Sequence, residues 1–332
     1  PRTRWHTRAL LALVWLAAAA PALYQLGLLS QAIAGRLAYP YDLEWMEGGM
    51  LHHALRVQAG AGLYVAPTID FIPYLYTPLY PTLIALLGGP LGISYLLGRA
   101  ISVAALVGIT ATTLGAVVGA PAASARPRAV SAGARWAGAA LALGLFAACY
   151  PFVEGWYDVV RADTLFLFMI TAGIAALPRW ATTGTGVAGH ARVAAGAVLL
   201  TLAFFCKQTG VIYVGLGAAI VLVVQWRRLL TYLVFASGLG LGGAWLLNQA
   251  SDGWFWTYVS RIHRAHDFNP DRFVASFRFI LWHFPAATIA IAVALVIVIA
   301  TRLRTGALPP GARPFVLWTA TYAVSTVVGA IG

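Results

Sequence analysis

Long apolar segments constrain this chain more than any other feature of its sequence. They follow one another, with short arginine-rich stretches between them. About 20 predominantly apolar residues suffice to cross a bilayer as one helix, and a helix satisfies its own backbone hydrogen bonds in lipid. The pattern therefore predicts an all-α fold, a polytopic transmembrane helical bundle. The predicted spans are 9–33, 95–121, 136–152, 164–178, 193–206, 210–225, 229–247, 280–301 and 315–332, with 193–206 and 210–225 short enough to be tilted or broken.

The composition also indicates that most of the chain lies in lipid rather than in water. Of the 332 residues, 61% are hydrophobic and 10% charged, whereas a soluble domain carries about 25% charged residues. The net charge of +12 would suggest nucleic acid as partner of a soluble protein. Here the basic residues cluster between apolar runs, as the positive-inside rule requires, so we expect membrane lipids and no nucleic acid as partners. Cys149 and Cys206 belong to no CxxC motif and are predicted core residues.

The apolar stretch 79–91 decides the predicted topology. It begins beside Pro78 and contains Gly88-Gly89-Pro90, so we interpret it as a short helix that dips into the outer leaflet without crossing. The first outer loop then covers 34–94, and thirteen of the 22 basic residues lie inside. If 79–91 crossed, roughly ten would lie inside against twelve outside, which fits the positive-inside rule less well. We therefore expect a multi-pass protein of the cell inner (plasma) membrane with a cytoplasmic N-terminus.

The same topology places all ten acidic residues on the outer side. Acidic residues contribute little to orientation, so their sorting has another cause. An ionised carboxylate at the centre of a spanning helix costs on the order of 2.5–3.5 kcal/mol on insertion scales. We expect these side chains in outer loops or in a water-filled cavity at that face. They are Asp42, Glu44, Glu47, Asp70, Glu154, Asp158, Asp163, Asp252, Asp267 and Asp271.

Three of these carboxylates crowd into six residues of the first outer loop. Asp42, Glu44 and Glu47 lie beside Trp45, and the i,i+3 spacing of Glu44 and Glu47 predicts that they share a helical face. Such crowding raises a carboxylate pKa, or it binds a cation or a hydroxyl-bearing substrate. The alternative is an acidic helix N-terminus stabilised by the helix dipole. We favour a functional cluster, because it opens a structured loop at the membrane face.

An amphipathic helix and an aromatic stretch follow the acidic cluster. The helix is predicted over about 47–59, and its adjacent His52 and His53 face different ways, which disfavours a two-histidine metal site. The stretch 74–81 supplies tyrosines and a proline-shaped helix start. An aromatic belt at the membrane interface accounts for part of this pattern.

Later outer segments add charged groups. Arg161 lies between Asp158 and Asp163, which predicts either an ion pair near lipid or a second carboxylate wall of one polar cavity. Lys207, the single lysine, precedes Gln208 between two short apolar helices, where a cation suits a phosphate or simply snorkels to the interface.

The segment 251–278 mixes aromatic and basic residues in a way that suits lipid headgroups and sugars. Its basic residues include Arg261, His263, Arg264 and His266. Because His263 and His266 are spaced i,i+3, a metal site with Asp267 is conceivable, although phosphate or sugar contact is the favoured interpretation.

Taken in order, these motifs resemble the GT-C superfamily of integral-membrane glycosyltransferases, particularly its protein-mannosyltransferase and aminoarabinose-transferase branch. Order and spacing match from residue 1 to about 225. No single motif is as specific as a Walker A loop, and the ordered set carries the resemblance. The matching stretches are 42–47, 54–60, 76–81, the span opening at Arg99, 161–163 and 207–208.

The resemblance implies an enzyme that uses a polyprenyl-phosphate-linked sugar donor on the outer face, with a lipid, glycan or protein acceptor. A first-loop acid would act as catalytic base, and Asp42, Glu44 and Glu47 compete for that role. The family's adjacent Asp-Glu pair is absent, because Met46 precedes Glu47; we favour Asp42, then Glu47. Some relatives need a divalent metal (Mg or Mn), which the carboxylates could hold. The implied substrate-binding residues are Asp158, Arg161, Asp163, Lys207, Gln208, Arg261, His263, Arg264 and His266, with Lys207, Arg261 and Arg264 on the lipid phosphate.

Two other functions compete with this interpretation. A transporter or flippase of a lipid-linked sugar or anionic lipid should have pseudo-symmetric repeats and ionisable groups near the bilayer midplane. The sequence shows no inverted repeat, and its acids gather at the ends of spans. A non-catalytic subunit of a membrane complex is the second alternative. The chain lacks an initial Met and ends within an apolar run at Gly332, so we expect one GT-C-like domain over 1–332 that continues beyond it.

Overall fold

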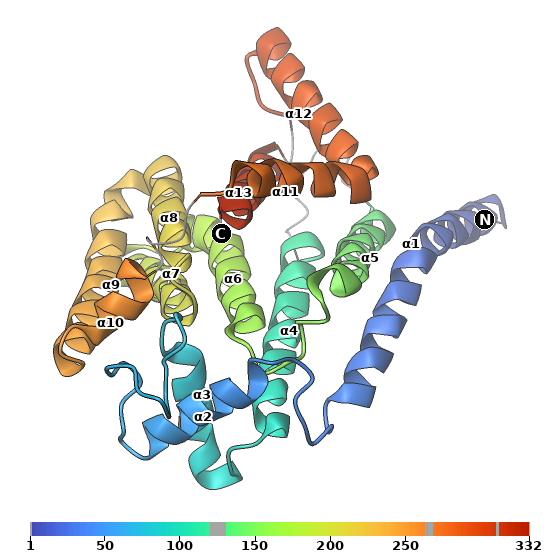
Figure 1. Cartoon of the computed structure of the whole chain (residues 1–332). Helices are drawn as coiled ribbons and strands as arrows, with labels where there is room; N and C mark the ends of the chain where they lie inside the picture. The colour runs from blue at the N-terminus through green and yellow to red at the C-terminus, as the bar shows by residue number, and fades with distance from the viewer. Residues whose placement is uncertain (1, 120–130, 263, 265–267, 310–311, 332) are drawn as a thin grey trace. The chain divides into compact units, whose positions relative to one another are not determined.

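The computed structural model describes residues 2–119, 131–262, 264, 268–309 and 312–331 (Figure 1). Within those ranges the regular structure is helical and contains no strand, which confirms the predicted all-α class. The chain forms two compact units, Pro1–Arg261 and Ile262–Gly332, and each is described by itself.

The first unit holds most of the helices. In chain order they are α1 (Arg2–Arg36), α2 (Glu47–Gln58), α3 (Leu79–Leu91), α4 (Tyr95–Val117), α5 (Ala132–Ala148), η1 (Tyr150–Val153), α6 (Ala162–Thr182), α7 (Gly186–Cys206), α8 (Gly210–Gln225), η2 (Trp226–Arg228), α9 (Leu229–Ala250), α10 (Trp254–Trp256) and η3 (Thr257–Arg261).

Six helical stretches of the described residues are long and apolar enough to cross a membrane. One of them, Gly210–Ala250, contains α8 and α9 with the turn η2 between them. α5 is shorter, with 17 residues, and ends at Ala148 rather than at the predicted 152. α7 is longer than predicted, because it begins at Gly186 rather than 193 and reaches 21 residues. The six stretches are Ala9–Arg36, Tyr95–Val117, Ala162–Thr182, Gly186–Cys206, Gly210–Ala250 and Pro285–Thr305.

Small residues allow the helices of the first unit to approach one another closely. α1 packs against α5, and α6 packs against α4 and α7. Gly144 of α5 faces Ala22 of α1 so closely that a Cβ added to Gly144 would lie 2.3 Å from the Ala22 Cβ. Gly173 of α6 receives Leu200 of α7 in the same way, with 2.5 Å to the nearest methyl. Such small residues at contacts are typical of helix packing in membranes.

The acidic loops gather at one end of this bundle. Arg99 at the start of α4 donates to the backbone oxygen of Arg36 at 3.1 Å, so the chain between α1 and α4 returns to the end where it began. The predicted non-crossing segment, α3, has 13 residues within that excursion. At the opposite end, Arg228 after α8 donates to backbone oxygens in the last turn of α6 and in the turn that follows it, those of Ala181, Thr183 and Gly184.

The second unit contains α11 (Pro270–His283), α12 (Pro285–Thr305) and α13 (Ala312–Ile331). The span predicted over 280–301 corresponds to α12, but its predicted start is misplaced, because α11 ends at His283 and a new helix begins at Pro285. Proline cannot donate the backbone hydrogen bond that a continuous helix needs there. α12 is one of the six candidate spans, whereas α13 is not.

Candidate functional site

A buried ion pair between Glu47 and Arg99 joins the start of α2 to the first turns of α4. Both side chains are 0% exposed. Arg99 Nε donates to Glu47 Oε1 at 2.9 Å, and its Nη2 donates to Oε2 at 2.7 Å. Two parallel bonds of this kind are the strongest way for a guanidinium to bind a carboxylate.

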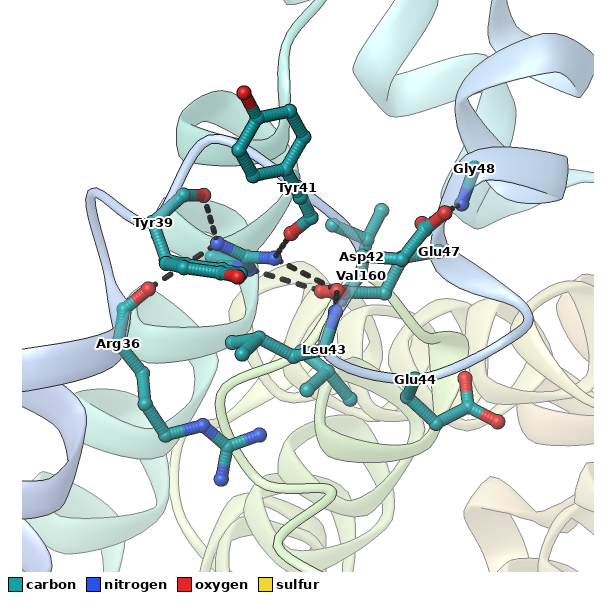
Figure 2. A network of polar contacts seen from close by, with 12 residues as sticks. Arg36, Tyr39, Tyr41, Asp42, Leu43, Glu44, Glu47, Gly48 and Val160 are labelled. Atoms are coloured by element: carbon teal, nitrogen blue, oxygen red, sulfur yellow. Dashed lines mark hydrogen bonds and ion pairs between the residues drawn. The ribbon is translucent and has the colours of Figure 1, made fainter.

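Backbone groups complete the hydrogen bonding of both partners. The amides of Leu43 and Val160 donate to the Glu47 carboxylate at 2.6 and 2.8 Å (Figure 2). Burial opposes ionisation of Glu47, but the bonds from Arg99 and from the two amides outweigh it and lower the Glu47 pKa. Glu47 is therefore a fixed, ionised carboxylate. Arg99 also donates to three backbone carbonyls, those of Arg36, Tyr39 and Tyr41.

The structure separates two carboxylates that we expected on one helical face. α2 begins at Glu47, whereas Glu44 lies before it and accepts bonds from Arg161 and from the Met46 amide. The prediction that they share a helical face is therefore wrong. Arg161 binds Glu44, whereas Arg99 binds Glu47 at a different place. The expected rise in pKa from crowding is also wrong for Glu47, whose pKa falls.

Asp42 is the exposed carboxylate of the acidic cluster. Its Oδ1 accepts from the Gly48 amide at 2.8 Å in the first turn of α2 (Figure 2). A Cβ added to Gly48 would lie 3.2 and 3.3 Å from the two Asp42 oxygens and 3.4 Å from the Tyr95 hydroxyl, so Tyr95 borders the same space. Trp45, which is 75% exposed, lies three residues away and meets the Tyr74 ring edge-on at 6.1 Å. Asp42 is thus held in place and open to solvent.

A second network of ion pairs runs from Glu44 to Lys207. Arg161 Nη1 donates to Glu44 at 2.9 Å, and its Nε donates to Asp163 at 3.0 Å. Lys207 Nζ donates to the other Asp163 oxygen at 2.8 Å. The Arg161 guanidinium also lies 3.9 Å from the centre of the Trp156 ring. The four charges alternate in sign, so they bind the first loop, the start of α6 and the end of α7 together.

Lys207 lies directly after α7, three residues before α8, at the predicted helix break. Its side chain is 29% exposed. On one side the Thr77 hydroxyl donates to the Phe204 carbonyl at 2.8 Å, and on the other the Gln208 amide donates to the Leu75 carbonyl at 3.1 Å. The first outer loop is thus fastened on both sides of Lys207. Contact of Lys207 and Gln208 with a phosphate stays a prediction.

Asp158 is a separate, fully buried carboxylate at the same end of the bundle. It lies 3.5 Å from Arg36 Nη1 and accepts from the Tyr150 hydroxyl at 2.8 Å. Burial raises the Asp158 pKa, although the Tyr150 bond and the Arg36 charge oppose the rise. The predicted ion pair of Arg161 forms with Asp163, and the second partner of Arg161 is Glu44 rather than Asp158.

His53 packs against Tyr74, the ring neighbour of Trp45. Its ring stacks on Tyr74 with 4.7 Å between centroids, and its Nε2 accepts from the Tyr74 amide at 3.0 Å. Nδ1 must therefore carry the proton, and it lies 2.6 Å from the Gly49 carbonyl. Burial lowers the His53 pKa, which favours the neutral ring. His52 meets the Phe71 ring edge-on at 5.4 Å, and the His53 ring lies 5.1 Å from the same ring, so the two histidines share this neighbour.

The third outer segment is only partly described. Arg261 and Arg264 are exposed and belong to different units. His263, His266 and Asp267 lie outside the described residues. Among the residues that the structure describes, no three His, Cys, Asp or Glu side chains could hold a metal ion together. The acidic cluster itself does not fit Mg²⁺ or Mn²⁺, because two of its three carboxylates are bound to arginine.

Several residues of this network were not predicted as site residues. Arg99 was noted only as the start of a span, and Arg36 and Tyr95 were not noted at all. A signal existed, since the predicted topology puts Arg36 and Arg99 at the outer ends of spans, against the positive-inside rule. A cation placed there against its preference needs a carboxylate partner, and outer acids are available.

Comparisons with known proteins add no precedent for this arrangement. The chain matches no protein-family model, no curated protein and no solved structure.

Proposed function

We propose that the protein is a membrane glycosyltransferase that moves a sugar from a polyprenyl-phosphate carrier to an acceptor hydroxyl at the outer face of the inner (plasma) membrane. One observation carries the proposal beyond the GT-C resemblance. Glu44 and Glu47 are bound to arginines, whereas Asp42 is exposed and accepts from the Gly48 amide. A general base must be within reach of the proton that it removes. Asp42 is therefore the proposed catalytic base, and Glu47 is a positioning residue.

The chemistry follows from these positions. The acceptor hydroxyl gives its proton to Asp42 as its oxygen bonds to the anomeric carbon of the donor sugar. The bond from that carbon to the phosphate oxygen breaks, and polyprenyl phosphate leaves with the electron pair. The leaving phosphate gains one negative charge, so a nearby cation stabilises it most after the bond has weakened.

Lys207 is the cation proposed for that charge. It and Asp163 are both partly exposed, at 29% and 26%, and such a pair contributes only about 0–1 kcal/mol. A phosphate can therefore displace Asp163 at small cost. Arg161 keeps its bonds to Asp163 and Glu44 during this exchange, so the loop stays fastened.

Transfer of radiolabelled sugar from polyprenyl phosphates in purified membranes tests the proposal. Asp42→Asn should lower the rate by about 10²–10⁴, the usual contribution of a general base. Asp70→Asn is the matched control, because Asp70 is an exposed acid of the same loop, and it should keep wild-type activity. Lys207→Ala should lower the rate of sugar transfer while the amount of folded protein stays the same. Full activity of Asp42→Asn, or no transfer by the wild type from any labelled donor, contradicts the proposal.

The proposed orientation has a separate test. Glu154 and Arg227 are both exposed and lie at opposite ends of the helices of the first unit. In a chain without Cys149 and Cys206, cysteine at 154 should react with an impermeant reagent from the outside of intact cells, and cysteine at 227 only after lysis. Reaction of both from the same side would contradict the orientation.

A further inference from the structure

A large aromatic side chain stands open to solvent beside the proposed base. Trp45 is 75% exposed, and it lies three residues from Asp42 and two from the start of α2. The proposed transfer needs no tryptophan there for proton removal or for phosphate binding. An indole that is neither packed in the core nor used by the chemistry is a candidate for ligand contact.

The support beneath Trp45 is rigid. Its ring meets Tyr74 edge-on at 6.1 Å, and Tyr74 stacks on the buried His53. Tyr74 also presses on the backbone of α2, since a Cβ added to Gly49 would lie 1.9 Å from the Tyr74 hydroxyl. The Tyr74 amide is fixed by His53 as well. The aromatic neighbour of Trp45 is therefore already held in place before a ligand binds, which lowers the cost of ordering this surface.

Polar groups of the acidic cluster lie on the residues next to Trp45 in the chain and close to its ring partner. The Asp42 carboxylate and the Tyr95 hydroxyl meet over Gly48, where an added Cβ would lie 3.2–3.4 Å from their oxygens. Burial and the charges of Glu44 and Asp42 raise the pKa of Tyr74, the aromatic neighbour of Trp45. The exposed indole thus shares one short segment with an exposed carboxylate.

A pyranose ring matches both parts of this surface. One face of the sugar presents C–H groups, whose slight positive charge favours the electron-rich face of an aromatic ring. The hydroxyls at its edge donate to carboxylates. A serine or threonine hydroxyl would use the carboxylate but leave the indole without a partner.

We propose that Trp45 is a stacking platform for a pyranose ring of the acceptor, so that the acceptor is a glycan rather than a peptide. The identification of this sugar as the acceptor rests on the proposed function, whereas its binding to Trp45 does not. The competing role for Trp45 is that of an anchor in the lipid headgroups, where tryptophans are common. An anchor would not require an exposed carboxylate at its side, since headgroup phosphates repel one.

Saturation-transfer NMR on the full chain in phosphatidylcholine nanodiscs tests the binding. The probes are the methyl pyranosides of glucose, galactose and mannose, with N-acetylserine amide as the non-sugar hydroxyl. We expect saturation of C–H protons on one face of at least one pyranoside. Trp45→Ala should weaken its binding by about tenfold or more, and Trp45→Phe should retain part of it. Trp226→Ala is the control, because Trp226 is 66% exposed at the other end of the helices, and it should bind as the wild type does.

Three results would overturn the inference: wild type that binds no pyranoside, Trp45→Ala that binds as well as wild type, or a serine derivative that binds as well as the sugars. Transfer kinetics separate this failure from that of the proposed function. If Asp42→Asn abolishes transfer while Trp45→Ala leaves KM for a glycan acceptor unchanged, the stacking role is wrong and the glycosyltransferase stands. If no donor is used but pyranoside binding depends on Trp45, the glycosyltransferase is wrong and the sugar site stands.

Discussion

Replacement of Arg99 should unfold the site more than any other single change at the acidic end of the bundle. In Arg99→Met, the Glu47 carboxylate would lose both of its guanidinium bonds, at 2.9 and 2.7 Å, and would remain 0% exposed. Removal of one partner of a buried ion pair typically costs about 3–5 kcal/mol, because the other charge stays behind without compensation.

The backbone contacts decide where in that range the cost falls. Arg99 also satisfies three carbonyls of the segment that leads into the acidic cluster. Each buried acceptor left unsatisfied costs about 1–3 kcal/mol unless water reaches it. We therefore expect a loss at the upper end, about 4–5 kcal/mol. Glu47→Gln should cost less, because its amide oxygen still accepts from Arg99 or from one of the two backbone amides.

Equilibrium unfolding in detergent, followed by helical circular dichroism, measures these losses. Arg56→Met is the matched control: Arg56 lies in the same loop and donates to the carbonyls of Gly62 and Ala61, but it is not in an ion pair with an acid. It should cost about 1 kcal/mol. The double variant Arg99→Met with Glu47→Leu should be more stable than the sum of the two single losses predicts, since no lone charge remains.

The reasoning would be refuted by two results in this series. One is an Arg99→Met protein that loses no more stability than Arg56→Met. The other is strict additivity in the double variant, which would mean that the two side chains contribute independently and that their pairing has no energetic consequence.

Three further predictions use other contacts. His53 has a lowered pKa, so its contribution to the free energy of unfolding is present above the ordinary histidine pKa of 6.5 and is lost as the pH falls below that value. Between pH 7.5 and pH 5.5 the wild type should therefore lose more free energy of unfolding than His53→Gln does. Gly144→Leu should force α1 away from α5 and cost about 1–3 kcal/mol in the same assay, whereas a null effect would mean that the helices can separate freely. Lys207→Met should cost at most about 1 kcal/mol, because its pair with Asp163 is partly exposed; a larger loss would make Lys207 structural.

The helices could be predicted because apolar runs of spanning length leave the chain few choices in lipid. α2 over 47–58 and the break at Lys207 also follow from local pattern, since amphipathic spacing and a lone cation between apolar runs are visible in the sequence. The helix boundary at Pro285, within the span predicted over 280–301, could also be read from the sequence, because proline is favoured at a helix start. It was missed because the hydropathy of the run outweighed a single residue.

The partners of the charges could not be predicted. Glu47 and Arg99 are 52 positions apart, and only the path of the loop brings them together. The i,i+3 spacing suggested that Glu44 and Glu47 act together, yet each forms an ion pair with a different arginine. Which carboxylate stays open is therefore a property of tertiary packing, and the sequence allowed all three.

The ion pairs at the acidic end bear on how the chain is inserted. Under the proposed orientation, Arg36, Arg99, Arg161 and Lys207 all reside on the side where cations are disfavoured, and each has a carboxylate partner there. The partners arrive on different segments, so a helix inserted the wrong way round would leave lone charges at both faces. The ion pairs therefore favour the chain in which all of these segments have inserted with their charged ends on one side.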